Sequence, residues 1–364
     1  MTLAVTNAPA AVRAAHADAL ERFPGPACPG FEATFTYVWD ICRAAVYVCV
    51  RDWRLRVFLP FCNHPGYRNT WGHQLTGVVD DPLPRDRWWC NADLLCTKAA
   101  GPQGWTVGPL AVYRDFLEAL LRRRPLRHAT LFLHRRDHPL VRQDGHHPYG
   151  HVWQDGHGPR VADTSGFLPI LSPYGSPAFR DRLIPTDVCW TVLRQAAPVH
   201  AGPWSARRPV ALFRGTATNP LRTTLVRVLG HRPDFDVALT HSAGGRLRAH
   251  RGHVDRTPPS GARECWLDPS DWARYRVVLA VDGHCGLNRW AHLVRSGAWI
   301  VRVSGSVAPD TLLASLVPHE HVDGTAPDWC DELVGVVARL LGRRRGPPPL
   351  RDLRHRLLDA VDLT

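Results

Sequence analysis

The fold is decided by the stretch RVVLAVDGHCGLNRWAHLVRSGAWIVRV, which runs from Arg276 to Val303. Its first apolar run, Val277 to Val281, is short and rich in β-branched residues, as expected for a buried strand. Two glycines then mark a turn, and Trp290, Leu293 and Val294 follow at helical spacing. Another glycine ends this helix, and a second apolar run begins. The stretch therefore predicts one strand–turn–helix–strand unit of an α/β protein.

The turn inside this unit carries the residues that suggest binding. Asp282 and Gly283 follow the first strand directly, and Arg289 stands where the helix begins. A loop at the carboxyl end of a parallel strand, followed by a helix, is where α/β sheets bind phosphorylated ligands. On this stretch alone, an ordinary turn with a solvated arginine fits equally well, because a lone glycine loop is a weak signal.

A second strand ends in the same way within PVALFRGTATNPLRTTL, Pro209 to Leu225. Its apolar run, Val210 to Phe213, leads into Arg214 and Gly215, and Arg222 stands at the start of a helical stretch. Two strands of one region thus each end at a glycine with an arginine nearby. Arginine pairs bidentately with phosphate and stays charged, so the arrangement suits a diphosphate.

Together these stretches resemble glycosyltransferase family 90, which includes the protein O-glucosyltransferases and the capsule xylosyltransferases. The resemblance covers residues 129 to 341 and rests on order and spacing. The matching residues are Phe213-Arg214-Gly215 with Arg222, Asp282-Gly283 with Arg289, Leu293, Ser296-Gly297, and the upstream segments HRRDHP (134–139) and PILS (169–172). The resemblance implies an α/β protein of the GT-B type, with two Rossmann-like domains facing across a cleft.

The resemblance also implies an activity. The implied reaction is the inverting transfer of a hexose or pentose from a UDP-sugar to a hydroxyl of a protein or glycan. Glucose and xylose are the leading candidates for the sugar. Asp137 lies just beyond the expected strand Thr130–His134 and would act as the general base. Arg214 and Arg289 would hold the diphosphate as its charge develops. Asp137 could instead cap a turn or pair with a neighbouring arginine.

The remaining donor-site residues have smaller implied roles. Arg222 would assist with the diphosphate or pair with an acid. Asp282 would bond ribose or sugar hydroxyls, while Gly215 and Gly283 would let the backbone approach the nucleotide. Ser296 and the glycine after it are interpreted as packing and a helix cap.

No metal and no cofactor are expected besides the UDP-sugar substrate. The histidine-rich segment Val141–Arg160 lacks the spacing of a known ligand pair, so it is interpreted as a polar loop. Asp234-Phe235-Asp236 has the letters of a metal-binding Asp-x-Asp motif. Because Arg232-Pro233 precede it, we place it in a turn and discount it.

Composition bounds the partners. The net charge of +12 raises the question of nucleic acid, but the arginines are scattered apart from Arg122–Arg124 and Arg343–Arg345, each at a predicted helix end. We therefore expect no nucleic-acid partner. A catalytically inactive relative that binds carbohydrate or serves as a scaffold is the alternative to an enzyme. Trp53 is one of several loop aromatics that could stack on a sugar, although packing is the commoner role.

The sequence suggests four segments. They are a helical extension at 1–27, an acceptor-side domain with Asp137 at 28–200, a nucleotide-sugar-binding domain at 201–345 and a C-terminal helix at 346–364. Within the second segment, Val46–Val50 and Arg54–Phe58 predict a hairpin.

The sequence also suggests where the protein works. No run of about 18 apolar residues predicts a membrane span, and Met1–Phe23 reads as an amphipathic helix with no secretory signal. We expect a cytoplasmic monomer, in the host cytoplasm if a virus encodes it. We expect its ten cysteines to be free thiols.

Overall fold

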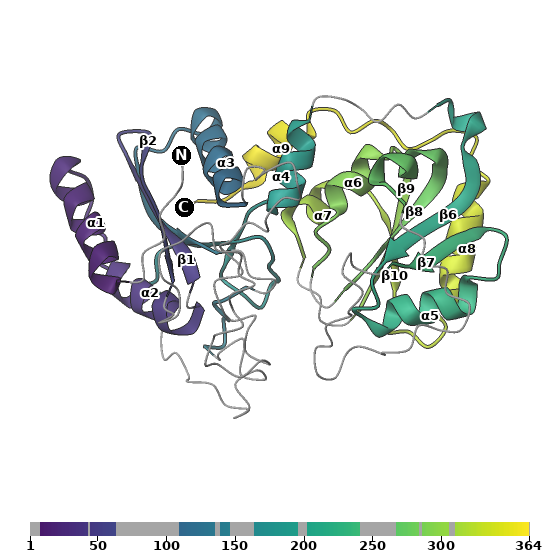
Figure 1. The fold of residues 1–364 in the computed structure, drawn as a ribbon, viewed down its shortest axis with the longest axis horizontal. Helices are drawn as coiled ribbons and strands as arrows, with labels where there is room; N and C mark the ends of the chain where they lie inside the picture. The colour runs from purple at the N-terminus through teal and green to yellow at the C-terminus, as the bar shows by residue number, and fades with distance from the viewer. Residues whose placement is uncertain are drawn as a thin grey trace, which may run out of the picture. The chain divides into compact units, whose positions relative to one another are not determined.

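The computed structural model describes residues 8–42, 44–62, 109–134, 139–145, 164–195, 202–240, 267–283, 286–305 and 310–363. The chain divides into two compact units, each with a five-stranded sheet (Figure 1). Unit 1 holds Met1–Trp190 and His355–Thr364, and unit 2 holds Thr191–Arg354. The division falls inside helix α4 (Asp187–Arg194) and again inside helix α9 (Leu353–Ala360).

Unit 2 is built on a parallel sheet. Its strand order is β10-β9-β8-β6-β7, and every neighbouring pair is parallel. The strands are β6 (Arg208–Gly215), β7 (Phe235–Leu239), β8 (Tyr275–Val281), β9 (Trp299–Ser304) and β10 (Glu320–Asp323). The chain passes from β6 to β7 on one side and then returns to place β8 on the other side of β6. The order of strands therefore reverses between β6 and β8.

Helices cover both faces of this sheet, because alternate residues of each strand point to opposite faces. Phe213, Leu279 and Val301 pack with α5 (Pro220–Leu229) and α8 (Trp329–Leu341) in one apolar cluster. Figure 1 shows α6 and α7 on the opposite side of the sheet from α8. The remaining helices described in unit 2 are η5 (Trp204–Ala206), η6 (Pro269–Arg274), α6 (Trp290–Arg295) and α7 (Leu312–Leu316).

The sequence predictions for unit 2 are confirmed in their main elements. Strands form at the three predicted apolar runs, and helix α8 ends at Leu341, directly before Gly342, as predicted. One prediction is wrong. Asp236 lies within strand β7 and not in a turn, because Phe235, Val237 and Leu239 alternate into the core.

Unit 1 has a mixed sheet of order β2-β1-β3-β4-β5. The predicted hairpin is confirmed: β1 pairs antiparallel with β2, and also with β3. Among the described strands of this unit, β3, β4 and β5 pair in parallel. Unit 1 therefore departs from the expected Rossmann-like domain, because antiparallel pairs form half of its sheet. The strands are β1 (Ala44–Arg51), β2 (Arg54–Cys62), β3 (His128–Leu133), β4 (Ile170–Ser172) and β5 (Arg182–Leu183).

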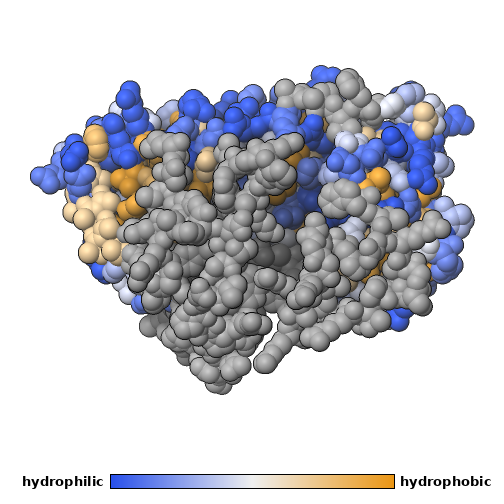
Figure 2. Space-filling view, in the orientation of Figure 1, coloured by the Kyte–Doolittle hydropathy of each residue, from blue (hydrophilic) through white to orange (hydrophobic). Residues whose placement is uncertain are grey.

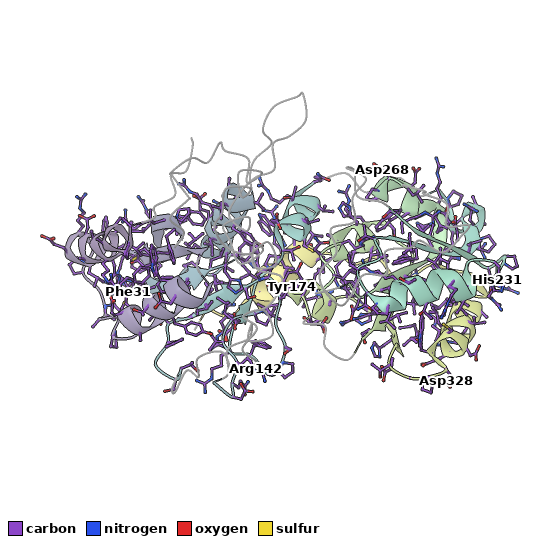
Figure 3. The ribbon with its side chains drawn as sticks, turned by 60° about the horizontal axis from the view of Figure 1, so that its bottom comes forward. Phe31, Arg142, Tyr174, His231, Asp268 and Asp328 are labelled. Atoms are coloured by element: carbon purple, nitrogen blue, oxygen red, sulfur yellow. The ribbon has the colours of Figure 1, made fainter. Side chains whose placement is uncertain are left out.

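Aromatic side chains fill one face of the unit 1 sheet. His16 stacks on Phe31, which is labelled in Figure 3, with ring centroids 3.7 Å apart. The Nδ1 atom of His16 lies 2.7 Å from the Tyr47 hydroxyl. Burial lowers the pKa of His16, so the ring is neutral inside this cluster at neutral pH. The helices described in unit 1 are α1 (Pro9–Arg22), α2 (Phe31–Tyr37), the π-helical turn η1 (Val38–Cys42) and α3 (Pro109–Arg123), together with α4 and α9.

Four further findings concern the described residues only. None of their helices is long and apolar enough to cross a membrane. They contain no group of three or more His, Cys, Asp or Glu side chains that could hold a metal ion. Cys28, Cys49, Cys189 and Cys330 are free thiols. The surface that the described residues present in Figure 2 is mostly hydrophilic.

Candidate functional site at the strand-order reversal of unit 2

The carboxyl ends of β6 and β8 lie side by side at one edge of the sheet. Leu212 pairs with Val278, so both strands reach this edge together. In open α/β sheets, ligands bind outside the carboxyl ends of the strands where the strand order reverses. The two glycine turns singled out in the sequence are the loops that follow these two strands. The structure therefore brings the predicted donor-site segments to one edge.

Arg222 ties the two loops together. Its side chain comes from α5, and the residue is 4% exposed. The guanidinium donates to the carbonyl of Thr216 (3.1 Å) and the hydroxyl of Thr218 (2.9 Å) after β6. It also donates to the carbonyl of Val281 (2.9 Å), the last residue of β8, and to that of Asp282 (3.0 Å), which follows the strand. Arg222 thus binds acceptors of the protein itself, from both segments.

Asn219 makes a second link between the loops, which the sequence analysis missed. Its side-chain oxygen accepts from the Leu221 N–H and caps α5, while its Nδ2 donates to the Gly283 carbonyl at 2.9 Å. Asn followed by Pro at the first helical position is a typical helix start, so the signal was present. We name Asn219 and Arg222, with the loop atoms that they bind, the loop clasp.

The two glycines serve this packing. A Cβ at Gly283 would lie 2.9 Å from the Arg222 guanidinium, and a Cβ at Gly215 would lie 2.7 Å from the Phe213 ring. Gly283 therefore makes room for the clasp, and Gly215 for a neighbouring side chain. The role foreseen for both, close approach to a nucleotide, is not needed to explain why glycine stands there.

Asp282 is buried at the same edge, at 1% exposure. Its Oδ2 lies 3.6 Å from an Arg302 guanidinium nitrogen and accepts from the Gly305 N–H at 3.3 Å. Arg302 makes its shorter contact, 2.6 Å, with Asp310. Burial raises the pKa of Asp282, and the shared arginine offsets this only in part. Asp282 thus links the ends of β8 and β9 and is covered from solvent.

Arg214 points away from this edge. Its guanidinium donates to the Asp236 carboxylate at 2.6 Å and to the Asp236 carbonyl at 2.7 Å. Asp236 pairs in register with Leu212, two residues back along β6. Asp236 also accepts from the Tyr275 hydroxyl at 2.6 Å. The Arg214 guanidinium is thus engaged in an ion pair inside the unit, and its predicted contact with a diphosphate stays a prediction.

The surroundings of Asp236 and Tyr275 fix their protonation states at neutral pH. Although burial opposes it, the hydrogen bonds from Tyr275 and Arg214 hold the pKa of Asp236 below its usual range. Burial and the nearby carboxylate raise the pKa of Tyr275 to about 12. The cluster therefore holds an ionised carboxylate between two arginines, Arg214 at 2.6 Å and the exposed Arg208 at 3.3 Å.

Arg289 differs from both other arginines. It precedes helix α6 and is half-buried, and one of its nitrogens donates to the Arg214 carbonyl. Its guanidinium carbon lies 5.9 Å from the centre of the Trp272 ring. Among the described residues no carboxylate forms an ion pair with it, and burial lowers its pKa. Arg289 is therefore a desolvated cation without an acidic partner in the described part of the chain.

The nearby carboxylate on η6 is already engaged. Asp268, labelled in Figure 3, caps that helix and accepts from the Ser270 N–H (2.8 Å) and hydroxyl (2.7 Å). These bonds hold the pKa of Asp268 below its usual value. After Arg289, the interpretation of the next turn is confirmed: Ser296 is fully buried, and Gly297 follows with φ +60° as a helix-ending glycine.

Asp137 lies outside the described residues, but both of its flanks are described. His134 follows β3, is fully buried, and its Nε2 lies 3.3 Å from the Asp181 carboxylate. The same carboxylate accepts from the N–H groups of Leu140 and Val141, each at 2.7 Å. Asp181 thus fixes the chain on both sides of the Asp137 segment at the end of β3. The sequence analysis did not single it out.

Comparisons with known proteins identify similar proteins but no matching family. No protein-family model matches the chain. Three curated viral proteins, each named only as uncharacterized, are similar to it. Protein 035R of Invertebrate iridescent virus 3 is 24% identical over 70% of this chain and 28% of its own length. Protein 027R of Frog virus 3 is 25% identical over 74% of this chain and 33% of its own length. Protein 179R of Invertebrate iridescent virus 6 is 22% identical over 76% of this chain and 30% of its own length.

The chain therefore spans about a third of the length of these relatives. Among solved structures, a glycotransferase of kitacinnamycin is similar at 19% identity, with a TM-score of 0.27. This likeness covers 53% of the present chain and 51% of that protein.

Proposed function

We propose that the chain is an inverting glycosyltransferase of the family 90 type. It transfers glucose or xylose from a UDP-sugar to a hydroxyl of a protein or glycan acceptor. The observation that carries the proposal is Arg289, a desolvated guanidinium without an acidic partner among the described residues, at the edge where β6 and β8 end. A cation that has lost part of its hydration is costly unless an anion matches it, and a diphosphate at this edge supplies that anion.

The donor-site residues divide the work in this proposal. Arg289 binds the diphosphate and stabilises its charge as the sugar departs. The loop clasp holds the two loops in place around the donor. Asp282, buried against Arg302, positions the end of β8. Arg214 supports Arg289 through its carbonyl, which accepts from the Arg289 guanidinium.

The proposed chemical step needs one base. Asp137 accepts the proton of the acceptor hydroxyl as that oxygen attacks the anomeric carbon. The bond from this carbon to the diphosphate oxygen breaks at the same time, so the sugar is inverted and UDP leaves with the bonding electrons. The carboxylate suits this role because it ends neutral, while the positive guanidinium receives the departing charge.

A thermal-shift screen with UDP, GDP, ADP and CMP, with and without a chelator, tests the donor. A ligand that binds only the folded state raises the melting temperature. We expect a shift with UDP that survives the chelator. No shift with any nucleotide would favour the alternative of a carbohydrate-binding or scaffold protein.

The Asp137→Asn variant tests the base. We expect it to abolish sugar transfer while UDP binds as in the parent protein, because the amide cannot accept the proton. The measurement is transfer of labelled sugar from UDP-glucose and UDP-xylose, beside calorimetric UDP binding. Equal loss of UDP binding would place Asp137 in the donor site and remove it as the base.

A further inference from the structure

The tip of the β1–β2 hairpin displays a tryptophan. Trp53 is 53% exposed, and among the described residues the next most exposed large apolar side chain is Val228, at 36%. The sequence analysis considered Trp53 as a loop aromatic whose commoner role is packing. In the structure its ring is open to solvent, so packing does not account for it.

The backbone at this tip has an unusual conformation for a tryptophan. Asp52 and Trp53 form the two-residue turn with φ +49° and +60°. A turn of this kind matches the twist of the two strands, but it favours Asn or Gly at both positions. A tryptophan with positive φ is uncommon and costs free energy. The stability of the hairpin alone would therefore select another residue.

Three arginines lie on the strands and turn next to Trp53, and one of them contacts its ring. Arg54, Arg56 and Arg127 are exposed, and the Arg127 guanidinium carbon lies 5.3 Å from the centre of the Trp53 ring. The Arg127 carbonyl accepts from the Trp53 N–H, which joins the start of β3 to the turn. Arg56 donates a hydrogen bond to the Arg51 carbonyl, and its exposed guanidinium lies over the Phe23 ring, 4.0 Å from the ring centre.

Within the described part of the chain, these three cations form no ion pair with a carboxylate, and Asp52 is the acid that the turn itself contains. Arg54 and Arg127 stand far apart in the sequence, so the gathering of positive charge arises only when β1 pairs with both β2 and β3. This is why scattered arginines gave no sign of a basic surface.

We propose that this hairpin tip binds single-stranded nucleic acid. A base stacks on Trp53, and phosphates pair with Arg54, Arg56 and Arg127. A duplex covers the faces of its bases and cannot stack on the ring. One exposed ring is too little apolar surface to insert into a membrane. A polyanion without rings would use the arginines but give no reason for the tryptophan in this turn.

The nucleic-acid proposal uses none of the residues of the proposed transferase activity. Trp53 and its arginines belong to the β1–β2 hairpin and the start of β3, whereas Arg289 belongs to unit 2 and Asp137 lies outside the described residues. Either proposal can therefore fail without the other.

The test is fluorescence anisotropy with labelled oligo-dT and oligo-U of about 16 nucleotides, the upper site size of a single binding domain. Trp53→Asn removes the ring at a position where Asn suits the backbone, so the hairpin still folds. We expect it to weaken binding at least about tenfold, while Trp53→Tyr keeps most of the affinity. The DNA and RNA probes decide which nucleic acid is preferred.

The charge is tested with a matched pair of triple variants. Replacing Arg54, Arg56 and Arg127 by Ala removes three phosphate contacts, so the slope of log K against log salt falls by about 2. The control replaces Arg22, Arg114 and Arg142, whose side chains are already paired with Asp18, Glu118 and Asp144. It removes the same charge, and we expect little change. Equal losses in both variants would reduce the binding to net charge and overturn the site.

Two competitors complete the test. Duplex DNA and inorganic polyphosphate should each displace the labelled oligo-dT poorly, because neither offers a free base face. The proposal fails if polyphosphate competes as well as unlabelled oligo-dT, if Trp53→Asn binds like the parent protein, or if neither probe binds.

Discussion

The loop clasp and the surroundings of Arg289 occupy the same edge of unit 2, yet they treat an arginine in opposite ways. Arg222 is buried, and its guanidinium donates to acceptors at the end of β8 and in the loops after β6 and β8. Arg289 has one protein acceptor described, the Arg214 carbonyl, and no carboxylate partner among the described residues. An arginine in a motif therefore becomes evidence for a ligand only after its acceptors within the protein are counted.

The largest effect is expected from Arg222→Lys. Lysine keeps the charge, but one ammonium cannot reach acceptors in both loops at once, and the carbonyls left buried lose their partners. We expect a loss of about 3 kcal/mol in the free energy of unfolding, which lowers the melting temperature by roughly 10 °C. Arg227→Lys, on an exposed site of the same helix, is the control and should change little. If the Arg222→Lys variant is as stable as the parent protein, Arg222 is not the structural residue that distinguishes it from Arg289.

An intermediate effect, on binding and not on folding, is expected from Arg289→Ala. Removing a charge-assisted contact should weaken calorimetric UDP binding about tenfold to a hundredfold. Stability should hold or rise, because a desolvated cation without a described carboxylate partner disappears. Arg227→Ala makes the same change of net charge on exposed surface. If Arg289→Ala unfolds the protein and UDP binding is unaltered, then Arg289 belongs with Arg222 as a structural residue.

The smallest effect concerns Asp282. Since its folded pKa is raised by burial, its contribution to stability is present at low pH and is lost as pH rises from about 3.8, the ordinary Asp value, through the folded pKa. Asp282→Asn should remove this decline in urea unfolding measured across acidic pH.

The exposed Asp323 provides the control for Asp282, because its pH dependence has the opposite sign. Its bonds with Thr325 lower its pKa, so its contribution to stability is lost as pH falls. Asp323→Asn should therefore remove a loss of stability at the acidic end. Similar pH profiles for the two variants would contradict the burial argument.

These arginines also show how far the sequence reached. The strands β6, β8 and β9 were predicted because each is a continuous apolar run, as buried parallel strands are. β7 was missed because Arg232-Pro233 directly before it indicated a turn, and β10 because only Val322 of its four residues is buried. The edge where the two loops meet followed from the rule for parallel strands.

The roles of individual residues could not be predicted in the same way. Whether Arg214 points to the edge or back to Asp236 depends on a residue on another strand, and no spacing within one stretch reveals it. Unit 1 shows the same limit at larger scale. Its hairpin was predicted from local turns, but the antiparallel pairing of β1 with β3 joins residues far apart in the chain. The general base Asp137 stays a prediction.

The return of residues 355–364 to unit 1 has a consequence for synthesis. Leu357, Leu358 and Val361 are buried in that unit, and Arg123 of α3 pairs with Asp359. All of unit 2 is therefore made before unit 1 has its last buried side chains. On a ribosome earlier segments generally fold first. Here unit 2 can be complete while unit 1 still lacks residues 355–364. A chaperone that shields unfinished apolar surface would have unit 1 as its substrate for longer.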